Sequence, residues 1–127
     1  MVHPATLVAL LVVIYLTAPT SASISTARLK VGDSFLIRES ENSQALVRDN
    51  ASGRQRMNTN GENAGKWVDK NGKTLDSSNF QLFQNGSVLL KSARLQDAGT
   101  YQKDPNPMIR IGDMGYAPPI LIIQVSN

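Results

Sequence analysis

The 127-residue chain contains no cysteine and a single histidine, His3. The absence of cysteine excludes a disulfide, a thiolate nucleophile, a cysteine-ligated zinc ion and an iron–sulfur cluster. His3 lies in a segment that we predict below to be removed, so a Ser-His-Asp triad is excluded as well. Carboxylates, lysines and tyrosines are the acid–base groups that remain.

The chain also has little net charge. Its 13 Lys and Arg residues and 10 Asp and Glu residues give +3, which is too small an excess to predict nucleic-acid binding. No pattern places two carboxylates together in a cleft, and a function has to be argued from a site. We therefore predict a protein that is not an enzyme and that uses no metal or cofactor. A hydrophobic content of 41% at this length predicts one globular domain.

Long hydrophobic runs are missing too. The uncharged run at residues 5–16 is shorter than the roughly 20 residues that span a bilayer, and no later run is long enough. Pro19 and small residues up to Ala22 follow it, which is typical of a cleaved secretory signal. We predict a signal peptide at residues 1–22 and secretion of residues 23–127. The alternatives are a retained N-terminal anchor and a buried strand.

The patterns in the rest of the chain are those of β-strands, with almost no helical period. Runs of β-type residues lie at 34–38, 66–70, 80–83, 88–93, 100–103 and 120–125. Asn71-Gly72 and Asn85-Gly86 are flanked by strand-like residues, and Asn-Gly is a strong hairpin signal. Residues 41–65 hold five asparagines and few large apolar residues, which predicts a long polar loop with a short strand near 45–48. Together these patterns predict an all-β sandwich.

Several segments resemble an immunoglobulin domain. Residues 67–75, WVDKNGKTL, resemble its strand C to C′ segment, with Trp67 in the core. Residues 80–90 resemble the D–E hairpin of the intermediate (I-set) type, and residues 32–37 resemble the entry to strand B. Residues 95–101, LQDAGTY, match the D-x-G-x-Y signature before strand F. The resemblance implies an immunoglobulin-like antiparallel β-sandwich at residues 23–127. The alternative is a fibronectin-type or other sandwich.

The D-x-G-x-Y match implies a structural role for three residues. Tyr101 would form a tyrosine corner, with its ring in the core and its hydroxyl bonded to upstream backbone. Asp97 and Gly99 suit the tight turn before it. In such domains a cysteine stands two residues after the tyrosine and another on strand B. Here those positions hold Lys103 and Glu39, so the inter-sheet disulfide is absent.

The opposite charges of Glu39 and Lys103 suggest an ion pair between the two sheets. A buried pair compensates for its desolvation only when its geometry is good. The equally weighted alternative is that one or both side chains extend to the rim and stay hydrated.

Two N-x-[ST] sequons are glycosylation acceptors in a secreted chain, one beginning at Asn50 and one at Asn85. Asn50 lies in the predicted polar loop, which makes it the better acceptor. Asn85 lies in a predicted tight turn, which exposes it but hinders transfer.

An apolar face is predicted along strands F and G. If Leu121 and Ile123 face the core, Ile120 and Ile122 point outward, because strand side chains alternate. Residues 107–116 add further apolar side chains in the F–G hairpin or its loop. An exposed apolar cluster usually marks a protein interface. We predict that it binds an extracellular or cell-surface protein, or a second copy of the chain. The predicted contact residues are Ile109, Ile111, Tyr116, Ile120 and Ile122. The alternative is that the loop folds back over the core.

A second class of function follows from basic side chains in the first half of the chain. They are Arg48, Arg54, Arg56, Lys66, Lys70 and Lys73. Such a loop could hold a matrix-associated protein on polyanions such as sulfated polysaccharide. Acidic residues are interleaved with them, so the alternative is a solvated loop whose charges keep the protein soluble.

Overall fold

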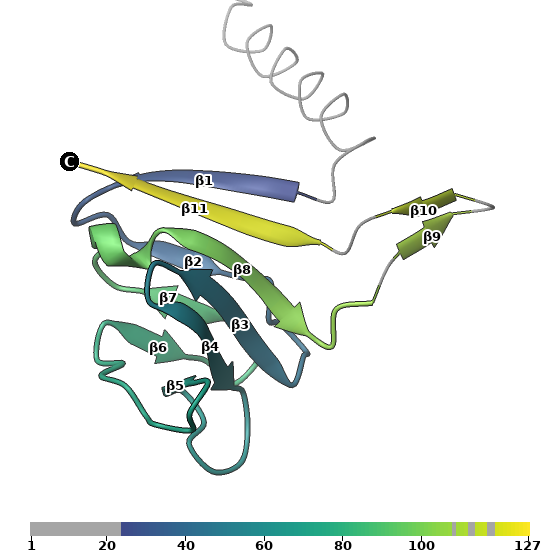
Figure 1. Cartoon of the computed structure of the whole chain (residues 1–127), viewed down its shortest axis with the longest axis horizontal. Helices are drawn as coiled ribbons and strands as arrows, with labels where there is room; N and C mark the ends of the chain where they lie inside the picture. Colours follow the sequence, from purple (N-terminus) through teal and green to yellow (C-terminus); the bar gives the residue numbers. More distant parts are fainter. Residues whose placement is uncertain (1–23, 108, 112–113, 117–118) are drawn as a thin grey trace, which may run out of the picture.

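The computed structural model describes residues 24–107, 109–111, 114–116 and 119–127. The first and last strands of its fold lie side by side (Figure 1). The predicted signal peptide at residues 1–22 lies outside these ranges and stays a prediction. Strand β1 (Ile24–Lys30) pairs in parallel with β11 (Ile120–Ser126), which in turn pairs antiparallel with β8 (Gly99–Asp104).

These three strands form one half of a six-stranded sheet with the order β1-β11-β8-β3-β4-β5. The other half comprises β3 (Ala45–Asn50), β4 (Gly53–Asn58) and β5 (Trp67–Asp69), all antiparallel to their neighbours. A three-stranded antiparallel sheet packs against it in the order β2 (Phe35–Ile37), β7 (Val88–Leu90) and β6 (Phe80–Leu82). The result is an all-β, immunoglobulin-like sandwich, which confirms the predicted fold class.

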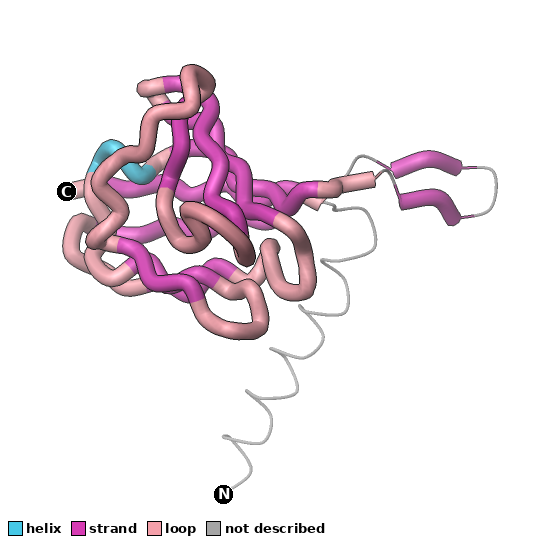
Figure 2. Tube along the Cα trace, turned by 90° about the horizontal axis from the view of Figure 1, so that it is seen from below, coloured by secondary structure: helices cyan, strands magenta, loops and turns pink. Residues whose placement is uncertain are grey.

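Two smaller elements complete the chain. A 3-10 turn, η1 (Leu95–Asp97), leads into β8. The hairpin of β9 (Ile109–Ile111) and β10 (Met114–Tyr116) follows β8 and projects beyond the two sheets (Figure 2).

The core lies between the two sheets, and strands such as β7 and β11 contribute alternate residues to it. Trp67 and Tyr101 are its largest fully buried side chains, and Leu121 and Ile123 face it from β11. The Trp67 ring packs edge-on against Phe80 at 5.4 Å and against Tyr101 at 6.3 Å between ring centroids. Edge-to-face geometry is the arrangement that aromatic pairs prefer.

The predicted polar loop at residues 41–65 is wrong in part: the short strand expected near 45–48 is present as β3, but β4 was not expected. It contains the hairpin of β3 and β4, and β3 lies in the middle of the six-stranded sheet. The inward positions of this hairpin include Arg48 and Gln55, which are buried polar residues opposite each other. Because these polar residues occupy core positions, the sequence does not alternate as a half-buried strand normally does.

The predicted placement of Trp67 on strand C is also wrong. The strand beside β8 is β3, and Trp67 lies on β5 at the edge of the sheet (Figure 1). Strands β4 and β5 therefore correspond to the C′ and C″ additions that distinguish the variable-type sandwich. The strand arrangement accordingly indicates the variable type instead of the predicted intermediate type.

Candidate interaction site

Tyr101 anchors the start of β8 against the turn that precedes it. Its buried hydroxyl donates a hydrogen bond to the Asp97 carbonyl oxygen at 2.6 Å. This contact, from a tyrosine to backbone a few residues upstream, is the tyrosine-corner geometry. Burial raises the pKa of the Tyr101 hydroxyl, so it stays a donor at neutral pH.

The Asp97 carboxylate is fully buried and joins the turn to the core. It accepts a hydrogen bond from the Arg94 backbone N–H at 3.0 Å and from the Arg94 guanidinium at 3.2 and 3.3 Å. Arg48 reaches it from β3 at 3.4 Å. One buried negative charge is thus surrounded by two guanidinium groups, which satisfies the requirement that a buried charge be paired.

Arg48 lies in the core although it is a cation, with 6% of its surface exposed. Its Nε donates to Gln55 Oε1 at 2.7 Å, and its Nη1 lies 3.3 Å from the Tyr101 hydroxyl oxygen. The guanidinium carbon stands 4.2 Å from the Trp67 ring centroid, a cation–π contact. Arg48 therefore connects β3, β4, β5 and β8. Its burial is a correction, because the sequence predicted Arg48 as part of an exposed basic loop.

Glu39 and Lys103, the residues at the cysteine positions, are electrostatically coupled across the sandwich. Burial raises the pKa of the Glu39 carboxyl, and the nearby Lys103 charge partly opposes that rise. Within the described ranges, no ion pair within 4.0 Å joins them.

Replacing Lys103 with alanine is expected to lower the free energy of unfolding by less than about 1 kcal/mol, because such weakly coupled charges contribute little. Urea denaturation of the parent and of Lys103→Ala would measure the difference. A loss of about 3 kcal/mol or more would show that the two charges form a buried pair in solution.

The outward face of the six-stranded sheet carries the predicted apolar residues Ile120 and Ile122. Their strand neighbours Leu121 and Ile123 lie opposite Tyr101 and Gly99 and face the core. Alternation therefore directs Ile120 and Ile122 away from the core, where each is half-buried.

The face continues across its neighbouring strands as rows of paired residues. On β1, Ile24 lies beside Ile120 and is 51% exposed. In the other direction, one row runs through Gln102, Val47, Arg56 and Val68, on β8, β3, β4 and β5. These four residues help to line a depression of about 490 Å³. We call this depression, together with the apolar end formed by Ile24, Ile120 and Ile122, the outer face. The sequence predicted only part of it.

Charged residues of both signs surround the depression. Arg54 of β4 pairs with Asp49 at 3.3 Å, and Arg56 pairs with Asp104. Each arginine has a carboxylate partner, whereas Lys70 and Lys103 also line the depression and have no ion pair within 4.0 Å among the described residues. The carboxylates therefore neutralise only part of its positive charge. A partner that binds there has to match alternating charges as well as apolar groups.

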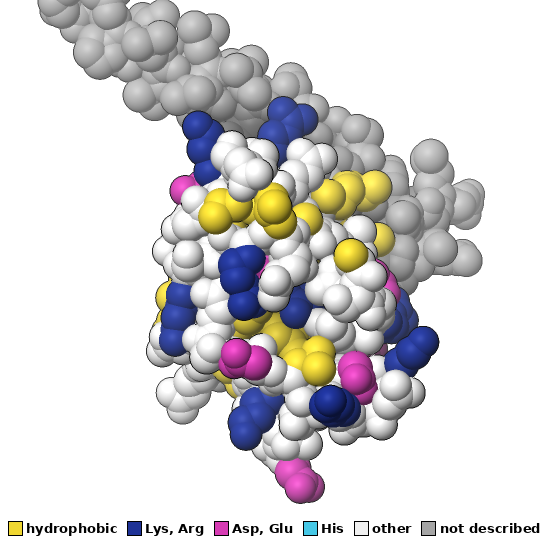
Figure 3. All heavy atoms as spheres, turned by 60° about the vertical axis from the view of Figure 1, so that its left-hand side comes forward, with side chains coloured by type: hydrophobic (Ala, Val, Ile, Leu, Met, Phe, Trp, Pro, Cys, Tyr) yellow, Lys and Arg dark blue, Asp and Glu magenta, His cyan; other side chains and the backbone are white. Residues whose placement is uncertain are grey.

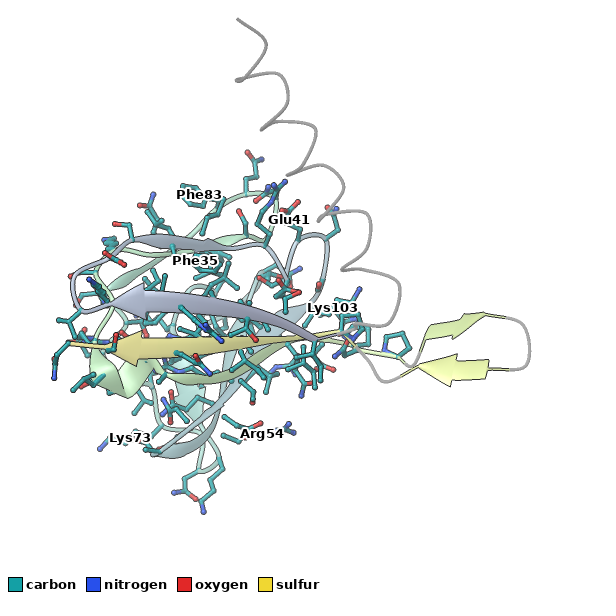
Figure 4. All side chains as sticks on the ribbon, turned by 90° about the horizontal axis from the view of Figure 1, so that it is seen from above. Phe35, Glu41, Arg54, Lys73, Phe83 and Lys103 are labelled. Atoms are coloured by element: carbon teal, nitrogen blue, oxygen red, sulfur yellow. The ribbon has the colours of Figure 1, made fainter. Side chains whose placement is uncertain are left out.

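The predicted basic loop forms a single surface only in part, because Arg54, Arg56 and Lys70 line the same depression and the other members do not. Arg48 is buried against Trp67, which removes one of its six members. Figure 3 shows one side of the molecule, on which Lys and Arg side chains are scattered among uncharged atoms. In Figure 4, Arg54 and Lys73 lie on the opposite side of the molecule from Phe83 and Phe35.

The remaining predicted contact residues belong to the projecting hairpin. Ile109 and Ile111 are on β9, and Tyr116 is on β10, where it pairs with Ile109. Their side chains lie outside the described part of the structure, so their role stays a prediction.

Other kinds of site find little support in the described residues. Over these ranges, no three His, Asp or Glu residues lie close enough to hold a metal ion. Among the same residues, no helix is both long and apolar enough to cross a membrane.

Comparisons with known proteins give structural likenesses of low identity. No protein-family model and no curated protein matches the chain. A crystal structure of CD84, described in terms of SLAM family function, is 15% identical with a TM-score of 0.45, covering 81% of this chain and 97% of that one. The extracellular domains of the voltage-gated sodium channel beta4 subunit, described as parallel homodimers with a role in cell–cell adhesion, are also 15% identical. Their TM-score is 0.44, over 84% of this chain and 88% of that one. At these values, function does not follow from either likeness.

Proposed function

We propose that this chain is a secreted recognition module that binds an extracellular or cell-surface protein through the outer face of its six-stranded sheet. A second copy of the chain is one partner of this kind. The observation that carries the proposal is the outward direction of Ile120 and Ile122 beside the exposed Ile24. Contiguous apolar residues at a surface, bordered by polar groups, are typical of a protein interface.

The composition of the face supports protein over polyanion as the partner. Its two arginines are already paired with carboxylates, which leaves Lys70 and Lys103 as the cations of the depression without an ion pair among the described residues. Two lysines offer a polyanion less positive charge than four free cations would. The alternative function, a matrix protein held on polyanions by a basic loop, loses the buried Arg48. The β9–β10 hairpin projects from the end of the same sheet and would extend the contact area (Figure 1).

Changing Ile120 and Ile122 together to aspartate is expected to abolish binding of the secreted protein to cells and matrix, because a burial contact cannot accept two desolvated carboxylates. Binding of the parent should survive about 0.5 M salt, at which ionic contacts are strongly screened. The measurement is retention of tagged protein on intact cells, with sedimentation analysis of self-association alongside it.

The matched control is Leu36→Asp. Leu36 is 40% exposed on β2, on the outward side of the other sheet, so the variant adds a charge without touching the outer face. It should bind as the parent does. Unchanged binding by the folded double variant would refute the proposal, and loss of the parent's binding in salt would favour the polyanion function.

The two sequons differ in how the fold engages their asparagines. Asn50 is half-buried, and its Nδ2 donates to the Gln96 carbonyl oxygen at 3.3 Å. Asn85 is exposed, and its Oδ1 accepts hydrogen bonds from the Ser87 N–H at 3.0 Å and hydroxyl at 2.6 Å, leaving Nδ2 without a described partner. These contacts favour Asn85 as the acceptor, the reverse of the order that sequence alone suggests. Occupancy of either site stays a prediction.

A further inference from the structure

The chain contains three Asn-Gly dipeptides, beginning at Asn60, Asn71 and Asn85. An asparagine followed by glycine is open to attack on its side-chain amide by the next backbone nitrogen, because glycine has no Cβ to hinder the approach. The reaction needs a free backbone N–H and a side chain that can turn toward it. The fold gives the three dipeptides different environments in both respects.

At Asn71 the attacking nitrogen, that of Gly72, is hydrogen-bonded. The Gly72 N–H donates to the Asp69 carbonyl oxygen at 3.0 Å, within the turn that closes after β5. The Asn71 backbone N–H is held as well, at 2.9 Å from Asp69 Oδ1. This turn has to open before Gly72 can react, and opening breaks both hydrogen bonds.

At Asn85 the attacking backbone N–H and the side-chain amide are both hydrogen-bonded. The Gly86 N–H donates to the Phe83 carbonyl oxygen at 3.0 Å, and the Asn85 Oδ1 accepts two hydrogen bonds from Ser87. The turn is also closely packed, since a Cβ on Gly86 would lie 2.6 Å from the Ser40 carbonyl oxygen. The reaction here requires a larger local rearrangement.

Asn60 lies at the tip of the loop between β4 and β5 and is exposed. Over the described residues, neither its side chain nor the Gly61 N–H has a hydrogen-bond partner. A Cβ built on Gly61 would meet nothing within 4 Å, so the surroundings are open. The loop is anchored on both sides, by the Thr59 hydroxyl on the Ser43 carbonyl oxygen and by the Gly65 N–H on the Asn58 carbonyl oxygen.

We propose that Asn60-Gly61 is a site of spontaneous deamidation in the folded protein. The Gly61 nitrogen loses its proton and bonds to Asn60 Cγ, whose amide nitrogen leaves as ammonia, and a five-membered succinimide forms. Water then adds to one of the two ring carbonyl carbons and breaks its bond to the ring nitrogen. The products are aspartate or isoaspartate at position 60, and either lowers the net charge by one.

The test is to hold the folded protein at mildly alkaline pH and to follow each asparagine by tryptic peptide mass spectrometry. Cleavage after Arg56 and Lys66 isolates Asn60 from the other two dipeptides. We expect Asn60 to react at least about tenfold faster than Asn71 and Asn85, because their hydrogen-bonded turns have to open first. Isoaspartate should be found at position 60 by enzymatic carboxyl methylation.

The matched control is the same incubation in concentrated urea, where the three dipeptides should react at similar rates. A rate ratio that stays the same with and without urea would show that sequence, and not the fold, sets the order. In Asn60→Gln the methylated product should disappear while unfolding is unchanged. Equal rates at Asn60 and Asn71 in the folded protein, or a faster reaction at Asn85, would overturn the proposal.

Discussion

Replacing Gly99 with alanine is expected to lower the free energy of unfolding by about 4 kcal/mol, from backbone strain and overpacking together. Gly99 has a φ of +155°, which L side chains rarely adopt. A Cβ there would lie 2.2 Å from the Asp49 carbonyl oxygen and 3.1 Å from Asn50 Cα. These are backbone atoms of β3, so relief would require β8 to move away from its neighbour in the centre of the sheet.

Gly53→Ala is the matched control for this substitution. Gly53 has a φ of +107°, but a Cβ on it would meet nothing within 4 Å. It should cost about 1–2 kcal/mol, from backbone strain alone. Urea denaturation followed by tryptophan fluorescence would measure both variants, because Trp67 is the single tryptophan and is fully buried. Equal losses of unfolding free energy in the two variants would show that the close approach of Gly99 to β3 adds no cost to the substitution.

Replacing Arg48 with methionine is expected to cost about 3 kcal/mol, the range measured when one partner of a buried ion pair is removed. Methionine keeps most of the apolar volume but leaves the buried Asp97 with Arg94 as its only cationic partner among the described side chains. The Gln55 and Tyr101 oxygens lose a donor, and the Trp67 ring loses the cation above it.

Arg54→Met provides the control for Arg48, since Arg54 also pairs with an aspartate but is 60% exposed. It should change the free energy of unfolding by less than about 1 kcal/mol. The same denaturation experiment compares the two variants. If Arg48→Met were as stable as the parent, the buried network would be replaceable by apolar packing, as some buried ion pairs are.

Local signals predicted the strands whose side chains alternate and the turns between them. The D-x-G-x-Y segment, the turns at Asn71-Gly72 and Asn85-Gly86 and the outward direction of Ile122 follow from short-range patterns. The hairpin of β3 and β4 could not be recognised in this way, because its core contains Arg48 and Gln55. The burial of Arg48 depends on Asp97 and Tyr101, which lie 49 and 53 residues further along the chain. Such long-range compensation leaves no local signal in the sequence.

The candidate site was predicted in part for the same reason. Alternation in β11 places Ile120 and Ile122 on one side, and that inference needs no partner strand. Val47 and Val68 join them only because β3 and β5 occupy the same sheet, a fact that depends on strand order. Residues that lie far apart in the sequence form one surface because their strands pair, and no short sequence motif predicts that pairing.

The parallel pairing of β1 with β11 has a consequence for how the chain folds. Ile24 meets Ile120, so the strand made early in synthesis has its sheet partner only when β11 has emerged from the ribosome. The closing contact joins distant parts of the chain, and sandwiches dominated by such contacts fold slowly, over milliseconds to seconds. Until then β1 is an unpaired strand, and its free backbone groups can pair with a strand of a neighbouring chain.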